Sequence, residues 1–136
     1  MFFLALSATL LATYFDLRAR EIPNGIPGLL AVAAGLAVAA GQHPLGAQSA
    51  VLGLILACAV TLPIFQRGWL GGGDVKLAVA LGLTLGAQPF VLFLCFTSVA
   101  GGALALLACI RGSAEFAYAP AMLLGLLAFY PLQWSL

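Results

Sequence analysis

Long apolar runs alternate along the whole chain with short segments that contain charged residues, glycine or proline. A transmembrane helix needs about 20 mostly apolar residues, within a range of about 17 to 25. The runs therefore predict an all-α, polytopic membrane protein of about six helices, several of them short. A thinner bilayer, or a helical turn that continues through Gly86 and Ala87, would accommodate the short helices. The predicted helices cover about residues 2–15, 26–40, 47–65, 74–85, 90–110 and 119–134.

The basic residues of the chain fall into alternate loops. The first, third and fifth loops hold all five of them, and the second and fourth loops hold none. Because cytoplasmic loops carry an excess of Lys and Arg, the odd-numbered loops are predicted to be cytoplasmic and both termini to face outward. Trp69 and Trp134 fit the two opposite membrane interfaces. The five basic residues are Arg18, Arg20, Arg67, Lys76 and Arg111.

The composition strengthens the membrane prediction. Of 136 residues, 64% are hydrophobic and 7% are charged, and the mean hydropathy is +1.17. Since a soluble domain carries about a quarter charged residues, one integral-membrane domain is predicted over residues 1–136. The net charge of +1, without a run of Lys or Arg, argues against nucleic acid as a partner. The first apolar run lacks the basic start and the cleavage site of a secretory signal, so we interpret it as a retained transmembrane helix.

Cysteines and many of the glycines lie within the apolar runs. The cysteines form no C-x-x-C pair, which argues against a metal site or a redox motif. A free cysteine in such a run is expected to behave as a small buried hydrophobe. The glycines are expected to let neighbouring helices approach closely. The cysteines are Cys58, Cys95 and Cys109, and the glycines are Gly35, Gly53, Gly82, Gly101, Gly102 and Gly125.

Two aspartates mark the candidate site. Asp16 lies at the end of the first predicted helix, and Asp74 follows three glycines at the start of the fourth. An acidic residue at a membrane boundary is expensive to keep, which makes it a functional-site candidate. The topology places both acids on the cytoplasmic side, so we predict one site built from both. The alternatives are that Asp74 is a helix N-cap and that Asp16 pairs with Arg18 or Arg20.

The chemistry of such a pair is that of acid–base catalysis. Two carboxyl groups in one site cannot both ionise cheaply, so one holds a proton and the other stays charged. The charged group takes a proton from water, which attacks a peptide carbonyl, and the protonated group donates to the carbonyl oxygen. Gly71, Gly72 and Gly73 allow a substrate chain to approach the backbone closely. They lack the pattern of a phosphate-binding loop.

Two motifs around these aspartates resemble the signatures of the prepilin peptidases. Asp16-Leu17-Arg18-Ala19-Arg20-Glu21-Ile22-Pro23-Asn24 is similar to the first signature. Gly71-Gly72-Gly73-Asp74-Val75-Lys76-Leu77 is similar to the second, the G-x-G-D motif shared with presenilin-type intramembrane proteases. Residues 116–125 resemble the family's segment entering its last helices. Asp16 and Asp74 match the family's catalytic pair, whereas Glu21, Asn24 and Lys76 fall within the motifs without a definite role.

The resemblance implies an aspartic endopeptidase of a bacterial inner membrane or an archaeal plasma membrane. Such an enzyme needs no metal or cofactor, and cleaves the short basic leader of a prepilin or pseudopilin precursor at the cytoplasmic side of the lipid bilayer. The short form resembles the peptidases of tight-adherence (Flp) pili. Longer members also methylate the new terminus and carry an N-terminal segment with paired C-x-x-C motifs. That segment is absent here, so methyltransferase activity is not expected.

Two other functions compete with the protease. The aspartates of a small transporter would bind protons or cations, but transporters place such residues near the bilayer midplane, and these lie at helix ends. A non-catalytic pilus assembly subunit would need neither aspartate. His43, in an outer loop, is interpreted as a loop or interface residue, and Glu115 as the partner of Arg111 in a surface ion pair. Candidates to line the substrate's path, or to form an interfacial aromatic belt, are Tyr14, Phe15 and Tyr118.

Overall fold

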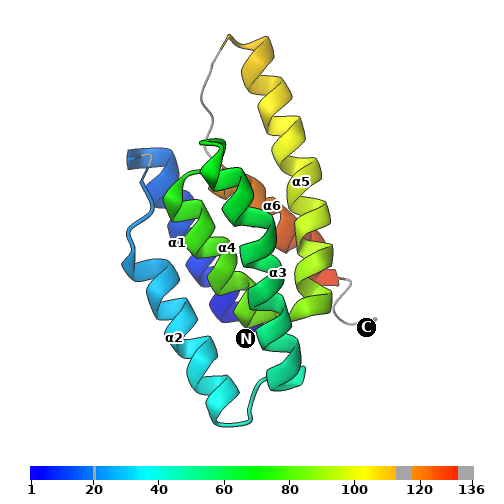
Figure 1. Ribbon diagram of the computed structural model, residues 1–136. Helices are drawn as coiled ribbons and strands as arrows, with labels where there is room; N and C mark the ends of the chain where they lie inside the picture. Colours follow the sequence, from blue (N-terminus) through cyan, green and yellow to red (C-terminus); the bar gives the residue numbers. More distant parts are fainter. Residues whose placement is uncertain (20, 113–117, 132–136) are drawn as a thin grey trace.

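The computed structural model describes residues 1–19, 21–112 and 118–131, and this part of the chain is helical and contains no strand. The prediction of an all-α protein with six helices is confirmed. Successive helices run in opposite directions (Figure 1), and short connections within the described residues join α2 to α3, α3 to α4 and α4 to α5. The helices are α1 (Phe2–Ala19), α2 (Gly25–Ala39), α3 (Gly46–Gln66), α4 (Gly72–Leu85), α5 (Ala87–Ile110) and α6 (Ala119–Phe129).

The boundary between α4 and α5 differs from the prediction. Gly86 has a φ of 82°, a left-handed conformation that ends α4 and that side chains rarely adopt. The suggestion that α4 continues through Gly86 is therefore wrong. Helix α5 begins directly after this residue, earlier than predicted, because Pro89 falls in its first turn, where the missing N–H has no helical partner to lose.

Three helices, α1, α3 and α5, are long and apolar enough to cross a membrane. Helices α2 and α6 are shorter and apolar. Helix α1 continues past the predicted end at Phe15, so Asp16 lies inside its last turn rather than after it. The helical part of α6 ends at Phe129, whereas Trp134 lies outside the described residues, as do Arg20 and Glu115.

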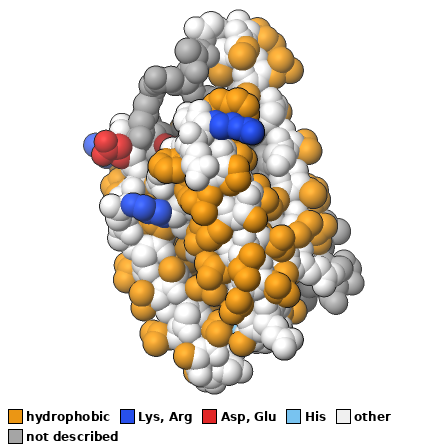
Figure 2. All heavy atoms as spheres, in the orientation of Figure 1, with side chains coloured by type: hydrophobic (Ala, Val, Ile, Leu, Met, Phe, Trp, Pro, Cys, Tyr) orange, Lys and Arg blue, Asp and Glu red, His pale blue; other side chains and the backbone are white. Residues whose placement is uncertain are grey.

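Helix α4 forms the centre of the bundle. Nine of its 14 residues are buried, against four of the 21 residues of α3. It packs mainly against α2 and α3 (Figure 1). The outer helices turn large apolar side chains outward, and Figure 2 shows these side chains over most of the visible surface. Charged side chains gather in the upper part of that view. An apolar surface around a buried centre is what a lipid environment requires.

Four of the predicted packing glycines lie at close contacts. A Cβ atom added to Gly53 or Gly82 would collide with the other helix's backbone, so α3 and α4 touch along their main chains. Gly101 lies under the ring of Tyr118, and Gly125 lies against Thr97. The prediction is wrong for the remaining two, because an added Cβ would meet no atom within 4 Å. Those two are Gly35 and Gly102.

The cysteines do not follow the prediction either. Cys95 and Cys109 are exposed on the outer surface of α5, and Cys58 is half-buried on α3. The outer surface of this bundle is itself apolar. Because a free thiol behaves as a small hydrophobic group, it fits on this surface as it would in a protein core. Cys95 and Cys109 therefore contribute outer surface rather than internal packing, and Cys58 contributes to both.

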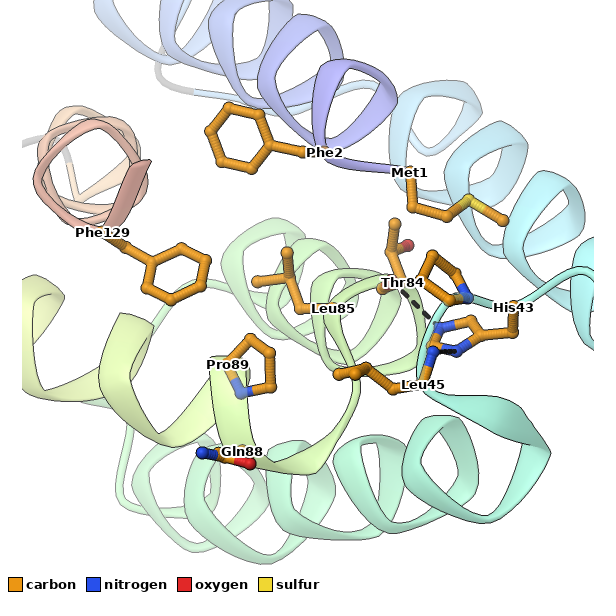
Figure 3. A pocket seen from close by; sticks show the side chains of 10 residues that line it. Met1, Phe2, His43, Leu45, Thr84, Leu85, Gln88, Pro89 and Phe129 are labelled. Carbon is orange, nitrogen blue, oxygen red and sulfur yellow. Dashed lines mark hydrogen bonds between the residues drawn. The ribbon is translucent and has the colours of Figure 1, made fainter. Parts of the chain in front are cut away.

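The two ends of α4 differ in character. We call the end where α1 stops and α4 starts the aspartate end, and the opposite end, where α4 meets α5, the histidine end. At the histidine end, buried His43 has its Nε2 atom 3.1 Å from the Thr84 carbonyl oxygen. Its Nδ1 atom accepts a hydrogen bond from the Leu45 N–H at 3.3 Å. Both ring nitrogens are thus engaged beside an open apolar pocket of about 240 Å³ (Figure 3).

Candidate active site

Asp16 is fixed by the start of α6. Its Oδ2 atom accepts a hydrogen bond of 3.0 Å from the N–H of Ala119, the first residue of that helix. One turn earlier on α1, the Thr13 hydroxyl lies 2.8 Å from the Thr9 carbonyl oxygen and 3.3 Å from the Ala119 carbonyl oxygen. The side chains of Asp16 and Thr13 on α1 therefore contact the N–H and the carbonyl oxygen of Ala119 on α6. These contacts fix the orientation of the Asp16 carboxylate.

Arg18 does not contact this carboxylate through a hydrogen bond or ion pair. Its Nη1 atom donates to the Tyr14 hydroxyl at 2.6 Å, and its guanidinium lies 5.9 Å from the centre of that ring. The alternative of an Asp16–Arg18 pair is therefore wrong. Asp16 is only 8% exposed and relies on a main-chain donor instead.

Asp74 is the third residue of α4, and Gly71 occupies the N-cap position. The N-cap alternative for Asp74 is therefore wrong. The side chain is 9% exposed, and its Oδ1 atom is buried without a hydrogen-bond partner among the described residues. Leaving a buried polar group unpaired costs about 1–3 kcal/mol, so such groups are rare in folded proteins and call for an explanation.

Both aspartates line one cavity of about 240 Å³. They lie close enough for their charges to interact, although 58 positions (74 − 16) separate them in the sequence. The cavity opens to the surface of the aspartate end. Its walls come from the end of α1, the following loop and the glycine segment at the start of α4. The lining residues are Asp16, Glu21, Ile22, Gly71, Gly72, Gly73 and Asp74.

The glycines leave room for the loop that follows α1. A Cβ atom on Gly73 would lie 2.9 Å from the Cβ of Ile22, too close for the loop to keep its position. A Cβ on Gly71 would lie 3.1 Å from the Asp74 Oδ2 atom. At Gly72 the nearest side-chain atom, on Phe65, would be at an ordinary 3.6 Å. The three glycines are therefore unequal, and Gly73 carries the tightest constraint.

The remaining motif residues divide into two groups. Glu21 is exposed and lines the cavity, so it belongs to the rim. Lys76 and Asn24 lie outside the lining, and the Lys76 ammonium donates a hydrogen bond of 2.7 Å to the Asn24 side-chain oxygen. This bond ties the loop between α1 and α2 to α4 and thereby supports one wall of the cavity.

Tyr118 is half-buried directly before α6, next to the residue that binds Asp16. Burial and the negative charge of Asp74 raise the pKa of Tyr118, so its phenol lies close enough to Asp74 to interact with that charge. Tyr14 is exposed on the outer surface of α1. Phe15 is half-buried, with its ring centre 5.6 Å from that of Tyr14, and none of the three aromatic candidates lines the aspartate cavity.

Sequence reasoning missed the role of Ala119. Its contribution is a main-chain N–H, which has no side-chain signature, and 103 positions separate it from Asp16. The available signal is Pro120 at the second position of α6, because proline in a first turn marks a helix start with free N–H donors. Among the described residues, no group of three or more His, Cys, Asp or Glu side chains is arranged to hold a metal ion.

Comparison with known proteins identifies the family. A family model for type IV leader peptidases matches residues 3–106, a range that includes both aspartates and the glycine segment. The chain belongs to the type IV leader peptidase family. No curated protein and no solved structure matches the chain significantly. Family membership implies a leader-peptidase-like protease with prepilin-type substrates, and it agrees with the apolar helices of this membrane protein.

Proposed function

We propose that this leader peptidase is an aspartic endopeptidase, with Asp16 and Asp74 as its catalytic pair. The observation that carries the proposal is that two buried acidic side chains from distant segments line one open cavity in a member of this family. Buried carboxyl groups that share a cavity hold a proton between them, which is the arrangement of an acid–base pair.

The proposed reaction is hydrolysis of a peptide bond by water held between the two carboxyl groups. The ionised carboxylate takes a proton from the water, whose oxygen attacks the scissile carbonyl carbon. The protonated carboxyl group donates its proton to the carbonyl oxygen, which gives a neutral tetrahedral intermediate. Collapse of this intermediate breaks the C–N bond, and a proton passes to the leaving amine. The Ala119 N–H keeps Asp16 oriented, and one oxygen of the Asp74 carboxyl group has no hydrogen-bond partner among the described residues.

We further propose that the substrate is the basic leader of a type IV prepilin-like precursor. Glu21 on the rim and the two aspartates give the cavity an acidic character, which suits a positively charged leader. The basic residues near the cavity lie at the same end of the bundle, which supports a cytoplasmic position for this end in a six-span arrangement. Arg67 lies 5.5 Å from the centre of the exposed Trp69 ring, an arrangement typical of a membrane interface.

The test uses the purified protein in lipid with a prepilin substrate, analysed by gel shift and N-terminal sequencing of the product. We expect the wild type to cleave once, directly before the hydrophobic segment, and Asp74→Asn to leave the precursor intact. Cleavage by both proteins would refute the assignment of Asp74. Cleavage by neither, from folded protein, would refute the protease, and proton flux in proteoliposomes would then support a transporter.

A further inference from the structure

We propose that Tyr118 is a positioning residue for this reaction: its ring rests on Gly101 of α5, and this contact fixes the start of α6 and the main-chain N–H that binds Asp16. The proposal rests on the proposed function, because it concerns the same pair of aspartates. Tyr118 is not among the residues that line the aspartate cavity. Its effect on the reaction therefore passes through the backbone at the start of α6.

Tyr118 is the N-cap residue of α6. Its carbonyl oxygen accepts hydrogen bonds from the N–H groups of Ala121, at 2.9 Å, and of Met122, at 3.3 Å. The N–H of Ala119 comes before these two and donates to Asp16 instead, at 3.0 Å. The first N–H groups of a helix have no regular partner within it, so the position of the helix start decides which outside acceptor they meet. The place where Tyr118 is held therefore decides where the donor to Asp16 lies.

Gly101 provides the seat for the Tyr118 ring. A Cβ atom added to Gly101 would lie 2.9 Å from the Cε2 atom of the ring and 3.6 Å from its Cζ and hydroxyl oxygen atoms. The first distance is shorter than real side chains allow, so only glycine fits there while the ring keeps its place. The neighbouring Gly102 differs, because a Cβ atom added there would meet no atom within 4 Å. Glycine is unfavourable inside a helix, and the ring contact gives it a reason at position 101.

Helix α6 packs against α5 and makes a second close contact with the same face of that helix (Figure 1). Thr97 lies one turn before Gly101 on α5, so both residues share one face. Thr97 meets Gly125 near the middle of α6, where an added Cβ atom would collide with the Thr97 backbone. Two separate contacts fix both the position and the direction of a helix. Only the contact of Tyr118 adjoins the donor to Asp16.

The position of the Ala119 N–H affects the protonation of the aspartate pair. A hydrogen bond to a carboxylate favours its ionised form, so losing the bond to Asp16 moves the first ionisation of the pair to higher pH. The described titratable and charged groups around Asp16 are Asp74 and Lys76 of α4, Glu21 of the loop, Tyr118, and Tyr14 and Arg18 of α1, which are bonded to each other. Substitutions in α5 leave all of these groups in the protein, so a shift of the pH profile reports the position of the N–H.

The experiment measures kcat and its pH dependence for the cleavage of a prepilin substrate by the purified protein in lipid. Gly101→Ala displaces the ring, and we expect kcat per folded molecule to fall about 10- to 100-fold, since misplacing catalytic groups by about 1 Å has an effect of this size. We also expect the acid limb of the pH profile to move to higher pH by about one pH unit. Gly102→Ala is the matched control, because it adds the same methyl group to the same helix without a clash, and it should change neither quantity.

Two variants of Tyr118 separate the ring from its hydroxyl group. Tyr118→Ala removes the ring without adding bulk, and should lower kcat and move the pH profile as Gly101→Ala does. It carries the same test if Gly101→Ala does not fold. Tyr118→Phe keeps a ring on Gly101 and should retain most of the wild-type kcat. The variant that combines Gly101→Ala with Tyr118→Ala should be no less active than Tyr118→Ala alone, because both changes remove the same contact.

Three results would overturn the proposal. The first is a wild-type kcat and pH profile in Gly101→Ala or in Tyr118→Ala. The second is a fall in kcat with an unmoved pH profile, or an equal fall in Gly102→Ala, because either would show a general loosening of the bundle. The third is a loss in Tyr118→Phe as large as that in Tyr118→Ala, which would assign the effect to the hydroxyl group. A wild type that cleaves no substrate would instead refute the proposed function, so the two failures are distinguishable.

Discussion

The two ends of α4 handle buried polar groups in opposite ways. At the histidine end, both nitrogens of His43 are engaged, and the Ser49 hydroxyl accepts a hydrogen bond of 3.1 Å from the Ala87 N–H. At the aspartate end, the Asp74 Oδ1 atom is buried and has no partner among the described residues. Fully paired groups stabilise a connection, whereas an unpaired one keeps a hydrogen-bonding capacity that the folded protein does not use. The difference indicates which end is built for stability and which for chemistry.

The largest expected effect comes from the hydrogen-bonded aspartate. Asp16→Asn retains an oxygen that accepts from the Ala119 N–H but cannot exchange a proton with water. We expect cleavage to fall by at least about 100-fold with an unchanged melting temperature. Asp16→Ala should lose the same activity and also about 1–3 kcal/mol in the free energy of unfolding, because α6 loses its partner. Substantial activity in Asp16→Asn, measured with a prepilin substrate, would contradict a catalytic role.

The next effect concerns the glycine segment. Gly73→Ala places a methyl group 2.9 Å from the Cβ of Ile22 and displaces the loop that forms one wall of the aspartate cavity. Misplacing catalytic groups by about 1 Å costs on the order of 100-fold, so we expect a loss of about 10- to 100-fold in kcat. The measurement is a steady-state cleavage assay. Gly72→Ala is the control, since its methyl group has an ordinary contact distance, and equal losses in both variants would refute the steric explanation.

At the histidine end the expected effect is on stability alone. His43→Ala removes the partner of the Thr84 carbonyl oxygen and the acceptor of the Leu45 N–H. We expect the free energy of unfolding to fall by about 1–3 kcal/mol, measured by denaturation in detergent. The kcat per folded molecule should stay unchanged. A loss of kcat without a loss of stability would show that the two ends do not divide their roles as proposed.

The smallest effect is expected at the Lys76–Asn24 bond, which is exposed to solvent. Lys76→Met should lower the free energy of unfolding by about 1 kcal/mol or less, as exposed hydrogen bonds contribute little. A double-mutant cycle with Asn24→Ala isolates the pair from other effects of each change. A coupling energy above about 2 kcal/mol would mean that this bond holds the cavity wall more firmly than its exposure suggests.

The predictable part of the fold follows from the apolar runs. Six runs separated by charge, glycine and proline correspond to six helices within the described residues, because helix length and burial leave a direct trace in composition. The helix ends were less predictable. In the sequence, Pro89 predicts the end of a helix, but it is tolerated within the first turn of α5. Only the backbone conformation shows that Gly86 separates α4 from α5.

The predictable part of the site is its pair of acids. Asp16 and Asp74 stand out because carboxylates are rare in so apolar a chain, and the structure brings them to one cavity. The contact between Ala119 and Asp16 could not be predicted. Pro120 signals that a helix begins there, but which distant side chain its N–H groups meet depends on how separate helices pack. The same reason explains why Gly82 lies at a helix contact while Gly35 lies at none.

The brevity of α4 has a consequence for the membrane itself. At a rise of 1.5 Å per residue, its 14 residues span about 21 Å, whereas the hydrocarbon layer is about 30 Å thick. In the proposed six-span arrangement, the catalytic centre therefore lies below the level of the lipid headgroups, and its open cavity brings water down to the peptide bond. The turnover of this enzyme should then depend on bilayer thickness, since thicker lipids lengthen the path that water and the charged leader must travel.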